Sequence, residues 1–315
     1  MYAKYFVLFA ILFTGWFLRK INFIDDQMNH SINKLIVYFA YPCMIVHNIG
    51  GIEMTPTVIR QFAITFGISL VFFYLYAVIA RLYTKARKFP DDMSNVSEFA
   101  MMLPNNGFMG FPVSLIFFGE TGLLLMLAHN SAMNIYIFTY GIKLMRRNNR
   151  GQRKMTPNLF IRAVFKLILN PNILALIIGL IVSLTPHSLP EAVDEYLLYI
   201  GGVSTPMAMI FIGSSLSNYK LSETLRDLRT LEASAMKLIW LPLITMGIVY
   251  ALPIAGIIKC IVILGAAFPT AATVSMLAEQ EGQSVATASR VLFISTLASM
   301  ATVPLVINLV TGMFL

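Results

Sequence analysis

Ten mostly apolar stretches, each long enough to cross a lipid bilayer as a helix, follow one another along this chain. A spanning helix takes about 20 apolar residues, and the stretches cover residues 2–18, 32–50, 58–82, 96–118, 123–144, 159–184, 197–217, 233–251, 254–277 and 285–309. Hydrophobic residues make up 57% of the 315 residues and charged residues only 12%, whereas a soluble domain carries about 25% charged residues. The sequence therefore predicts an all-α polytopic membrane protein and excludes soluble, disordered and nucleic-acid-binding classes.

The cations predict how these spans are oriented. Lys and Arg are retained on the cytoplasmic side of a membrane, and the first, third, fifth and seventh connections contain fifteen of the 23 cations. These are Arg19, Lys20, Arg81, Lys85, Arg87, Lys88, Lys143, Arg146, Arg147, Arg150, Arg153, Lys154, Lys220, Arg226 and Arg229. We therefore expect odd-numbered connections inside and both termini outside, although the ninth connection, residues 279–283, has no cation. Cations near span ends, such as Lys237, are expected to reach the membrane interface.

Five spans in each half give the halves, residues 1–155 and 156–315, opposite orientations. Prolines suggest that the halves correspond: Pro42 and Pro104 are 62 residues apart, and Pro206 and Pro269 are 63 residues apart. A proline inside a spanning helix frees a backbone carbonyl that hydrocarbon cannot satisfy, so each such position must face protein or water. The spacing predicts two inverted five-helix repeats.

The fourth and ninth spans are expected to be interrupted near the middle of the bilayer. The predicted helix breakers are Pro104, Gly110 and Pro112 in the fourth span and Pro269 in the ninth. A single proline of this kind is typical of an ordinary helix kink. Matching interruptions in halves of opposite orientation instead indicate broken helices that cross, which is the arrangement found at the binding sites of secondary transporters.

The residues at the predicted crossing favour an organic anion as the ligand. None of the 15 acidic residues falls at the centre of a predicted span, which disfavours proton–cation exchange. Amides, hydroxyls and helix N-terminal N–H groups can together bind a carboxylate. The predicted substrate site therefore contains Asn105, Asn106, Gly107, Thr270 and Thr273. Asn130 and Asn134 share one face of the fifth span and either join this site or form interhelical hydrogen bonds.

No enzyme, metal or cofactor site is predicted. The chain lacks HExxH and GxSxG motifs, which carry zinc and nucleophile chemistry. Cys43 and Cys260 lie in apolar stretches and are interpreted as small buried hydrophobes. The coupling ion, a proton or sodium, is left open.

Several segments of the chain resemble the auxin efflux carrier family. They are Leu103-Pro104-Asn105-Asn106-Gly107-Phe108-Met109-Gly110-Phe111-Pro112, Phe118-Gly119-Glu120-Thr121-Gly122, the Asn130 and Asn134 pair, Asn170-Pro171-Asn172, Pro206-Met207-Ala208-Met209 and Phe268-Pro269. The resemblance implies a fold similar to bile-acid symporters and sodium/proton antiporters. Spans one, two, six and seven would then form a scaffold, and spans three to five and eight to ten a transport domain.

The resemblance also implies an alternating-access carrier of organic anions. Plant members carry auxin, and bacterial members are taken as carriers of malate, malonate or related acids. The fifth connection, Arg146 to Lys154, lacks the long hydrophilic insertion of many plant members, so we expect a permease of the bacterial plasma membrane. A homodimer formed through the scaffold helices is a further implication of the family.

Two other functions stay open at this point. A sodium-coupled symporter of a larger amphipathic anion needs several oxygen ligands, and Glu98 and Glu279 are the acidic residues nearest the predicted crossing. A membrane receptor or sensor would bind its ligand without net transport.

Overall fold

The computed structural model describes residues 2–147, 169–185, 189–217 and 227–315. Almost all of these residues are helical, and their extended pairing consists of a single isolated bridge. Residues 159–168 of the sixth predicted span and the cations Arg150, Arg153, Lys154, Lys220 and Arg226 lie outside the described residues.

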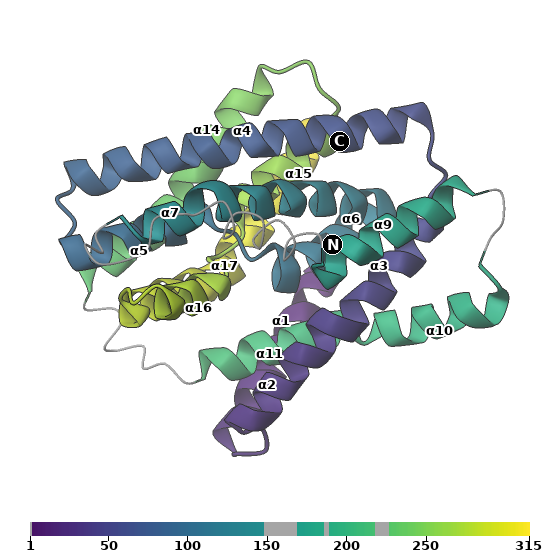
Figure 1. Cartoon of the computed structure of the whole chain (residues 1–315), viewed down its shortest axis with the longest axis horizontal. Coiled ribbons are helices and arrows are strands. Elements are labelled where there is room, and N and C mark those ends of the chain that lie inside the picture. Colours follow the sequence, from purple (N-terminus) through teal and green to yellow (C-terminus); the bar gives the residue numbers. More distant parts are fainter. Residues whose placement is uncertain (1, 148–168, 186–188, 218–226) are drawn as a thin grey trace. The chain divides into compact units, whose positions relative to one another are not determined.

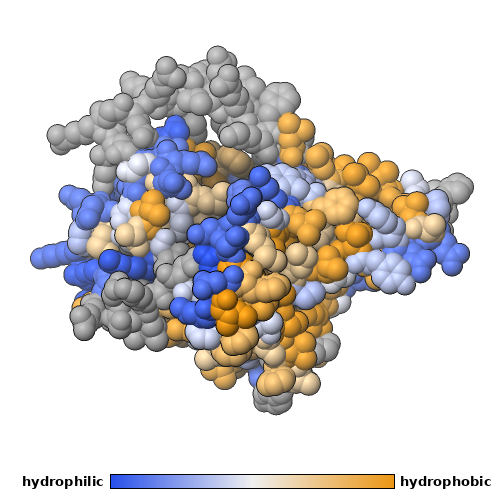
Figure 2. Space-filling view, turned by 90° about the horizontal axis from the view of Figure 1, so that it is seen from below, coloured by the Kyte–Doolittle hydropathy of each residue, from blue (hydrophilic) through white to orange (hydrophobic). Residues whose placement is uncertain are grey.

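The helices and the surface confirm a polytopic membrane protein. Within the described residues, five helical segments are long and apolar enough to cross a membrane: Pro56–Ala86, Asn106–Met145, Glu191–Leu216, Leu228–Tyr250 and Val285–Phe314. Pro171–Leu184 and Gly256–Ala267 are shorter apolar helices. Hydrophobic residues cover broad areas of the surface in Figure 2, and Phe6, Val71 and Leu305 are 75%, 68% and 67% exposed. Such continuous apolar exposure suits contact with lipid.

The chain divides into two compact units, which we describe separately. Unit 1 comprises Met1–Arg60, Phe111–Leu127 and Val164–Asn218, and unit 2 comprises Gln61–Gly110, Ala128–Ala163 and Tyr219–Leu315. The helix α6 (Phe111–Tyr136) contributes to both units. It consists of two helices joined at Gly119, whose φ of 67° is a backbone conformation that glycine adopts readily.

Unit 1 is built from two sets of packed helices. Its other elements are α1 (Tyr2–Lys20), α2 (Asp26–Leu35), the π-helical segment η1 (Ile36–Ala40), α3 (Tyr41–Gly50), α9 (Pro171–Leu184), α10 (Glu191–Gly202) and α11 (Ser204–Leu216). α1 packs along α11, and α3 packs against α9 and α10 (Figure 1). Asn170 caps α9 by accepting a hydrogen bond from the Asn172 amide, with Pro171 at the first helical turn.

The contact between α1 and α11 depends on glycines. A Cβ atom on Gly213 would lie 1.9 Å from the Leu12 carbonyl oxygen, and one on Gly15 would lie 2.2 Å from the Ile210 carbonyl oxygen. Small residues let spanning helices approach through their backbones, and this close packing stabilises helix pairs in lipid.

We therefore expect Gly213→Ala to lower the free energy of unfolding by about 1–3 kcal/mol, because the methyl group forces α1 away from α11. Thermal unfolding of the detergent-solubilised protein measures this loss. Gly312→Ala is the matched control, since Gly312 also lies in a helix but has no heavy atom within 4 Å of the position that its methyl group would take. Equal melting temperatures for Gly213→Ala and the wild type would contradict this packing.

Unit 2 surrounds the long helix α17 (Val285–Phe314). Its other elements are α4 (Pro56–Ala86), α5 (Asp91–Met102), η2 (Asn106–Gly110), η3 (Ile137–Gly141), α7 (Ile142–Met145), α13 (Leu228–Ala235), η4 (Met236–Trp240), α14 (Leu241–Tyr250), α15 (Gly256–Ala267) and α16 (Thr273–Gln280). α17 packs against α5, α13, α15, α16 and η4, and Figure 1 shows it in yellow beside α15 and α16.

Prolines follow three of the π-helical segments. Pro42 follows η1, Pro112 follows η2 and Pro242 follows η4. Proline lacks an amide hydrogen, and its ring crowds the carbonyl four residues earlier. The wider π turn relieves this conflict, so the helix continues through each of these prolines.

Candidate functional site

Two interruptions of helical structure in unit 2 form the centre of the candidate site. α5 ends at Met102 and η2 begins at Asn106, while α15 ends at Ala267 and α16 begins at Thr273. A proline disfavours helical geometry in the residue before it. Accordingly, Leu103 (φ −92°, ψ 104°) and Phe268 (φ −64°, ψ 147°) are extended.

Gly110 and Pro112 do not break the helix, contrary to the sequence-based expectation. Gly110 has helical angles, φ −66° and ψ −47°, and Pro112 lies in the first turn of α6. The π turn of η2 accommodates the proline, so the helical path is continuous from Asn106 into α6. The interruptions are therefore short and centred on Pro104 and Pro269.

Backbone hydrogen bonds join the two interruptions to each other. The Asn105 amide donates to the Pro269 carbonyl at 2.8 Å, and the Ala271 amide donates to the Leu103 carbonyl at 3.0 Å. Together they form the isolated antiparallel bridge. Non-helical backbone at membrane depth needs protein partners because hydrocarbon offers none, so each interruption satisfies groups that the other leaves free.

Thr270 helps to hold this arrangement. It is fully buried, its hydroxyl donates to the Ala100 carbonyl at 2.9 Å, and its amide donates to Ser295 Oγ at 3.1 Å. Its hydroxyl hydrogen is thus already used within the protein. Thr273, the first residue of α16, is exposed.

Helix ends of both polarities lie at the interruptions. α5 and α15 end there with carbonyl groups, and η2 and α16 begin there with N–H groups. Helix N-terminal N–H groups favour anions. Gly107, in η2, is half-buried and has no heavy atom within 4 Å of the position that a Cβ would take.

Asn106 has a side chain with unused hydrogen-bonding capacity. It is fully buried, and its Oδ1 has no hydrogen-bond partner among the residues that the structure describes. Its Nδ2 donates to Met133 Sδ at 3.6 Å, and a thioether is a weak acceptor. Asn105 is 6% exposed, and its Oδ1 accepts from the Phe108 amide at 3.3 Å. Because a buried amide with unmet hydrogen bonds is costly, Asn106 is the stronger ligand-binding candidate.

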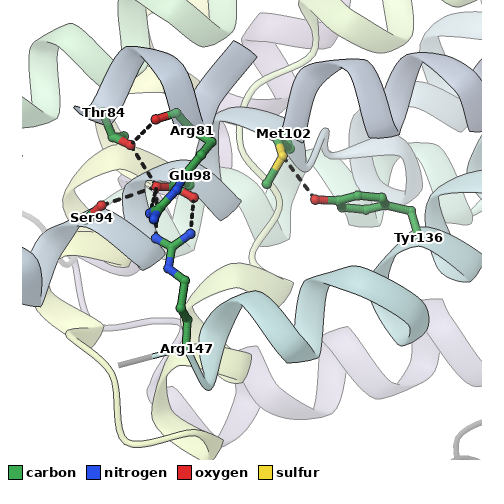
Figure 3. Close-up of polar contacts among 7 residues, drawn as sticks. All are labelled: Arg81, Thr84, Ser94, Glu98, Met102, Tyr136 and Arg147. Carbon is green, nitrogen blue, oxygen red and sulfur yellow. Dashed lines mark hydrogen bonds and ion pairs between the residues drawn. The ribbon is translucent and has the colours of Figure 1, made fainter. Parts of the chain in front are cut away.

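The contact with Met133 relates the fifth predicted span to Asn106. Asn130 lies three residues before Met133 on α6 and so shares a helix face with it, whereas Asn134 is the next residue and does not. Asn130 is 8% exposed and Asn134 is half-buried. Tyr136 donates from its hydroxyl to Met102 Sδ at 3.0 Å (Figure 3), which holds the same helix against the end of α5.

Comparison with known proteins shows the family of this chain. The sequence matches the family described as membrane transport protein over residues 1–307. The chain belongs to this family, the auxin efflux carriers. A protein of Methanothermobacter thermautotrophicus, named as an uncharacterized transporter, is 24% identical over 298 residues, 94% of each chain. A protein of Rhizobium meliloti, named as a candidate malonate transporter, is 23% identical over 303 residues, 94% of this chain and 91% of the relative. Membership of a transporter family implies a carrier and not an enzyme.

This transporter has a buried lysine where the sequence suggested an interfacial one. The expectation for Lys237 is wrong, because the residue is 0% exposed and its Nζ has no hydrogen-bond partner within the described parts of the chain. It lies in η4, which packs against α5, α15 and α17.

Glu98, considered above as a sodium ligand, instead binds two arginines (Figure 3). This buried carboxylate accepts from both Arg147 terminal nitrogens at 2.9 and 3.0 Å, from Arg81 Nη1 at 3.1 Å and from Thr84 Oγ1 at 2.7 Å. A bidentate arginine contact is strong and directional. The oxygens of Glu98 are therefore already occupied, while Glu279 is exposed.

Further ion pairs connect the basic connections of the transporter within unit 2. Arg146 binds both oxygens of Glu281 at 2.6 and 2.7 Å, which joins the fifth and ninth connections. The ninth connection thus lacks a cation of its own but binds one from the fifth. The other pairs are Arg87 with Glu232 and Arg290 with Asp227.

Asp227 also begins α13 as its N-terminal cap. It accepts from the Arg229 amide at 3.1 Å and from Arg290 Nη1 at 3.3 Å. Partial burial raises the pKa of this carboxyl, but hydrogen bonds from Thr230, Arg290 and the Arg229 amide outweigh it and hold the pKa below its usual value. Asp227 therefore stays ionised at neutral pH and compensates the charge of Arg290.

Proposed function

We propose that this chain is a secondary transporter of small organic anions, such as malonate or malate, that works by alternating access. The observation that carries the proposal is the hydrogen-bonded pair of interruptions with the buried side chain of Asn106 beside it, whose Nδ2 donates only to a thioether sulfur in the described structure. No acidic residue occurs at 103–110 or 268–273, so no fixed negative charge of these segments repels an anion. The name of the Rhizobium meliloti relative supports a dicarboxylate.

The chemistry of the site suits a carboxylate. Nδ2 of Asn106 donates only to a sulfur atom in the described structure, and a carboxylate oxygen is a better acceptor that replaces it at little cost. N–H groups at the start of η2, near Gly107, and of α16, at Thr273, supply further donors. In this proposal Asn130 and Asn134 bind the second carboxylate of a dicarboxylate. Asn105 and Thr270 act mainly by holding the interruptions together.

The proposed architecture has ten spans in two inverted five-helix repeats, residues 1–155 and 156–315, with the fourth and ninth helices broken and crossing. Spans one, two, six and seven serve as the scaffold, through which two copies pair, and spans three to five and eight to ten form the domain that moves during transport. The proposed location is the plasma membrane, with both termini outside. The ion pairs Arg146–Glu281 and Arg87–Glu232 link odd-numbered connections within unit 2, which supports placing these connections on the same side of the membrane.

The sodium-coupled alternative receives less support. Sodium prefers several oxygen ligands, as hard cations do, but the oxygens of Glu98 are bound to arginines. We therefore expect transport to continue when choline replaces sodium.

Counterflow in proteoliposomes tests the proposed function. Vesicles loaded with unlabelled malonate should take up labelled malonate from sodium-free buffer, and malate should compete, whereas protein-free vesicles should not. Malonate should also raise the melting temperature of the purified protein, because a ligand that binds only the folded state stabilises it. Folded protein that shows neither counterflow nor stabilisation with any mono- or dicarboxylate would refute the proposal.

A further inference from the structure

Unit 2 contains a buried pair of titratable side chains that the proposed substrate site does not use. Lys237 and His129 are each 0% exposed. Nδ1 of His129 lies 2.7 Å from Ser69 Oγ, whereas Nε2 of His129 and Nζ of Lys237 have no hydrogen-bond partner among the described residues.

His129 and the segment that carries Lys237 each lie against a helix that ends at an interruption. A Cβ atom on Gly265 would lie 2.2 Å from His129 Nε2, and Gly265 is four residues before Pro269 on α15. The segment η4, which carries Lys237, packs against both α5 and α15. A charge on Lys237 therefore acts on a ligand at the crossing through closely packed, water-poor protein.

Other titratable groups lie on α4, on α6 and on the helices that pack against η4. Those named below are exposed or are bound to groups other than Lys237. The ion pairs are Glu98 with Arg81 and Arg147, Glu232 with Arg87 and Arg229, and Arg290 with Asp227. The hydrogen bonds run from Lys259 to the Tyr250 carbonyl, from Cys260 to the Val310 carbonyl, and between Tyr76 and Thr245, Tyr136 and Met102, and Tyr74 and Thr139. The exposed groups are Asp91, Asp92, Glu120 and Tyr250. Within the described residues, no acidic side chain thus offers Lys237 a counter-charge.

An ammonium group is costly to bury without a counter-charge. That cost falls when an anion binds nearby, because opposite charges attract strongly in a medium of low dielectric constant. Substrate binding and protonation of this amine therefore favour each other, as the reciprocity of coupled binding requires.

We propose that Lys237 is the proton-binding site that couples this transporter to the proton gradient. The amine takes up a proton from water when the organic anion binds at the crossing. It returns that proton to water when the anion leaves on the other side, so a proton and the anion cross together. The inference rests on the proposed function and adds the coupling ion to it.

Calorimetry of malonate binding provides the first test. Titrations at neutral and mildly alkaline pH, in buffers with different ionisation enthalpies, report the protons taken up on binding. The wild type should take up a proton, and Lys237→Met and Lys237→Arg should take up none. Lys259→Met, which removes a lysine of the same unit that donates to a backbone carbonyl, should behave as the wild type does.

Transport provides the second test. With the membrane potential clamped at zero, an inward gradient of about one pH unit should drive about tenfold accumulation of malonate by the wild type, because each tenfold ratio corresponds to about 1.4 kcal/mol. Lys237→Arg should keep malonate counterflow but lose this gradient-driven accumulation. The proposal is overturned, with the proposed function intact, if the wild type shows counterflow without proton uptake, or if Lys237→Arg still accumulates malonate. Absence of malonate binding and counterflow in the folded wild type would overturn both.

Discussion

Malonate counterflow should fall about 10- to 100-fold when Asn106 is replaced by alanine. A hydrogen bond to a charged group contributes about 1.5–3 kcal/mol, and about 1.4 kcal/mol corresponds to a factor of ten. The substitution also removes an amide oxygen that has no partner in the described structure, so the protein should lose little stability. The initial rate of labelled malonate uptake, at equal amounts of reconstituted protein, measures the effect.

Asn308→Ala is the matched control for this variant. Asn308 is a half-buried asparagine on α17 of the same unit, but it lies outside the predicted site, so its loss should leave counterflow unchanged. Asn105→Ala should have a smaller effect, because the Asn105 contact that joins the interruptions is made by its backbone amide. Wild-type rates in both Asn105→Ala and Asn106→Ala would remove the site assignment.

Glu98→Ala should lower the free energy of unfolding by about 3 kcal/mol. Breaking a buried ion pair from one side costs about 3–5 kcal/mol because the remaining charge is left uncompensated. The lower value applies here because the side chains of Arg81 and Arg147 are 34% and 26% exposed and so are partly solvated. Thermal unfolding in detergent measures the loss.

Two further variants show whether the loss of stability comes from the contacts of Glu98 with the two arginines. Glu98→Gln keeps the shape and some hydrogen bonds to the arginines, so we expect a smaller loss than with alanine. Glu279→Ala removes an exposed acid of the same unit and should leave the melting temperature unchanged. A melting temperature for Glu98→Ala equal to that of the wild type would show that the cluster does not stabilise unit 2.

The interruptions could be predicted because their cause is local. Pro104 and Pro269 act on the residues directly before them through sterics that need no tertiary contact. The same reasoning failed at Pro112, where a π turn absorbs the proline and the helix continues. Proline alone therefore indicates strain in a helix, and the packing around it decides between a break and a wider turn.

The roles of the polar residues were harder to predict. Thr270 was predicted to belong to the substrate site, and in the structure its hydroxyl hydrogen is used by the Ala100 carbonyl. The ninth connection was an exception to the charge pattern, and its Glu281 binds Arg146 from the fifth. These partners are 170 and 135 residues apart in the chain, so no local pattern could pair them.

The sequence by itself determined that this protein is helical and crosses a membrane, because long apolar stretches must be buried in lipid and must satisfy their backbone groups internally. It also located the two interruptions, because proline acts on its immediate neighbours. Only the tertiary structure decided which polar groups keep spare hydrogen-bonding capacity. Asn106 and Lys237 are buried by helices that are distant in sequence, and burial, unlike hydrophobicity or backbone preference, is a property of the packed chain.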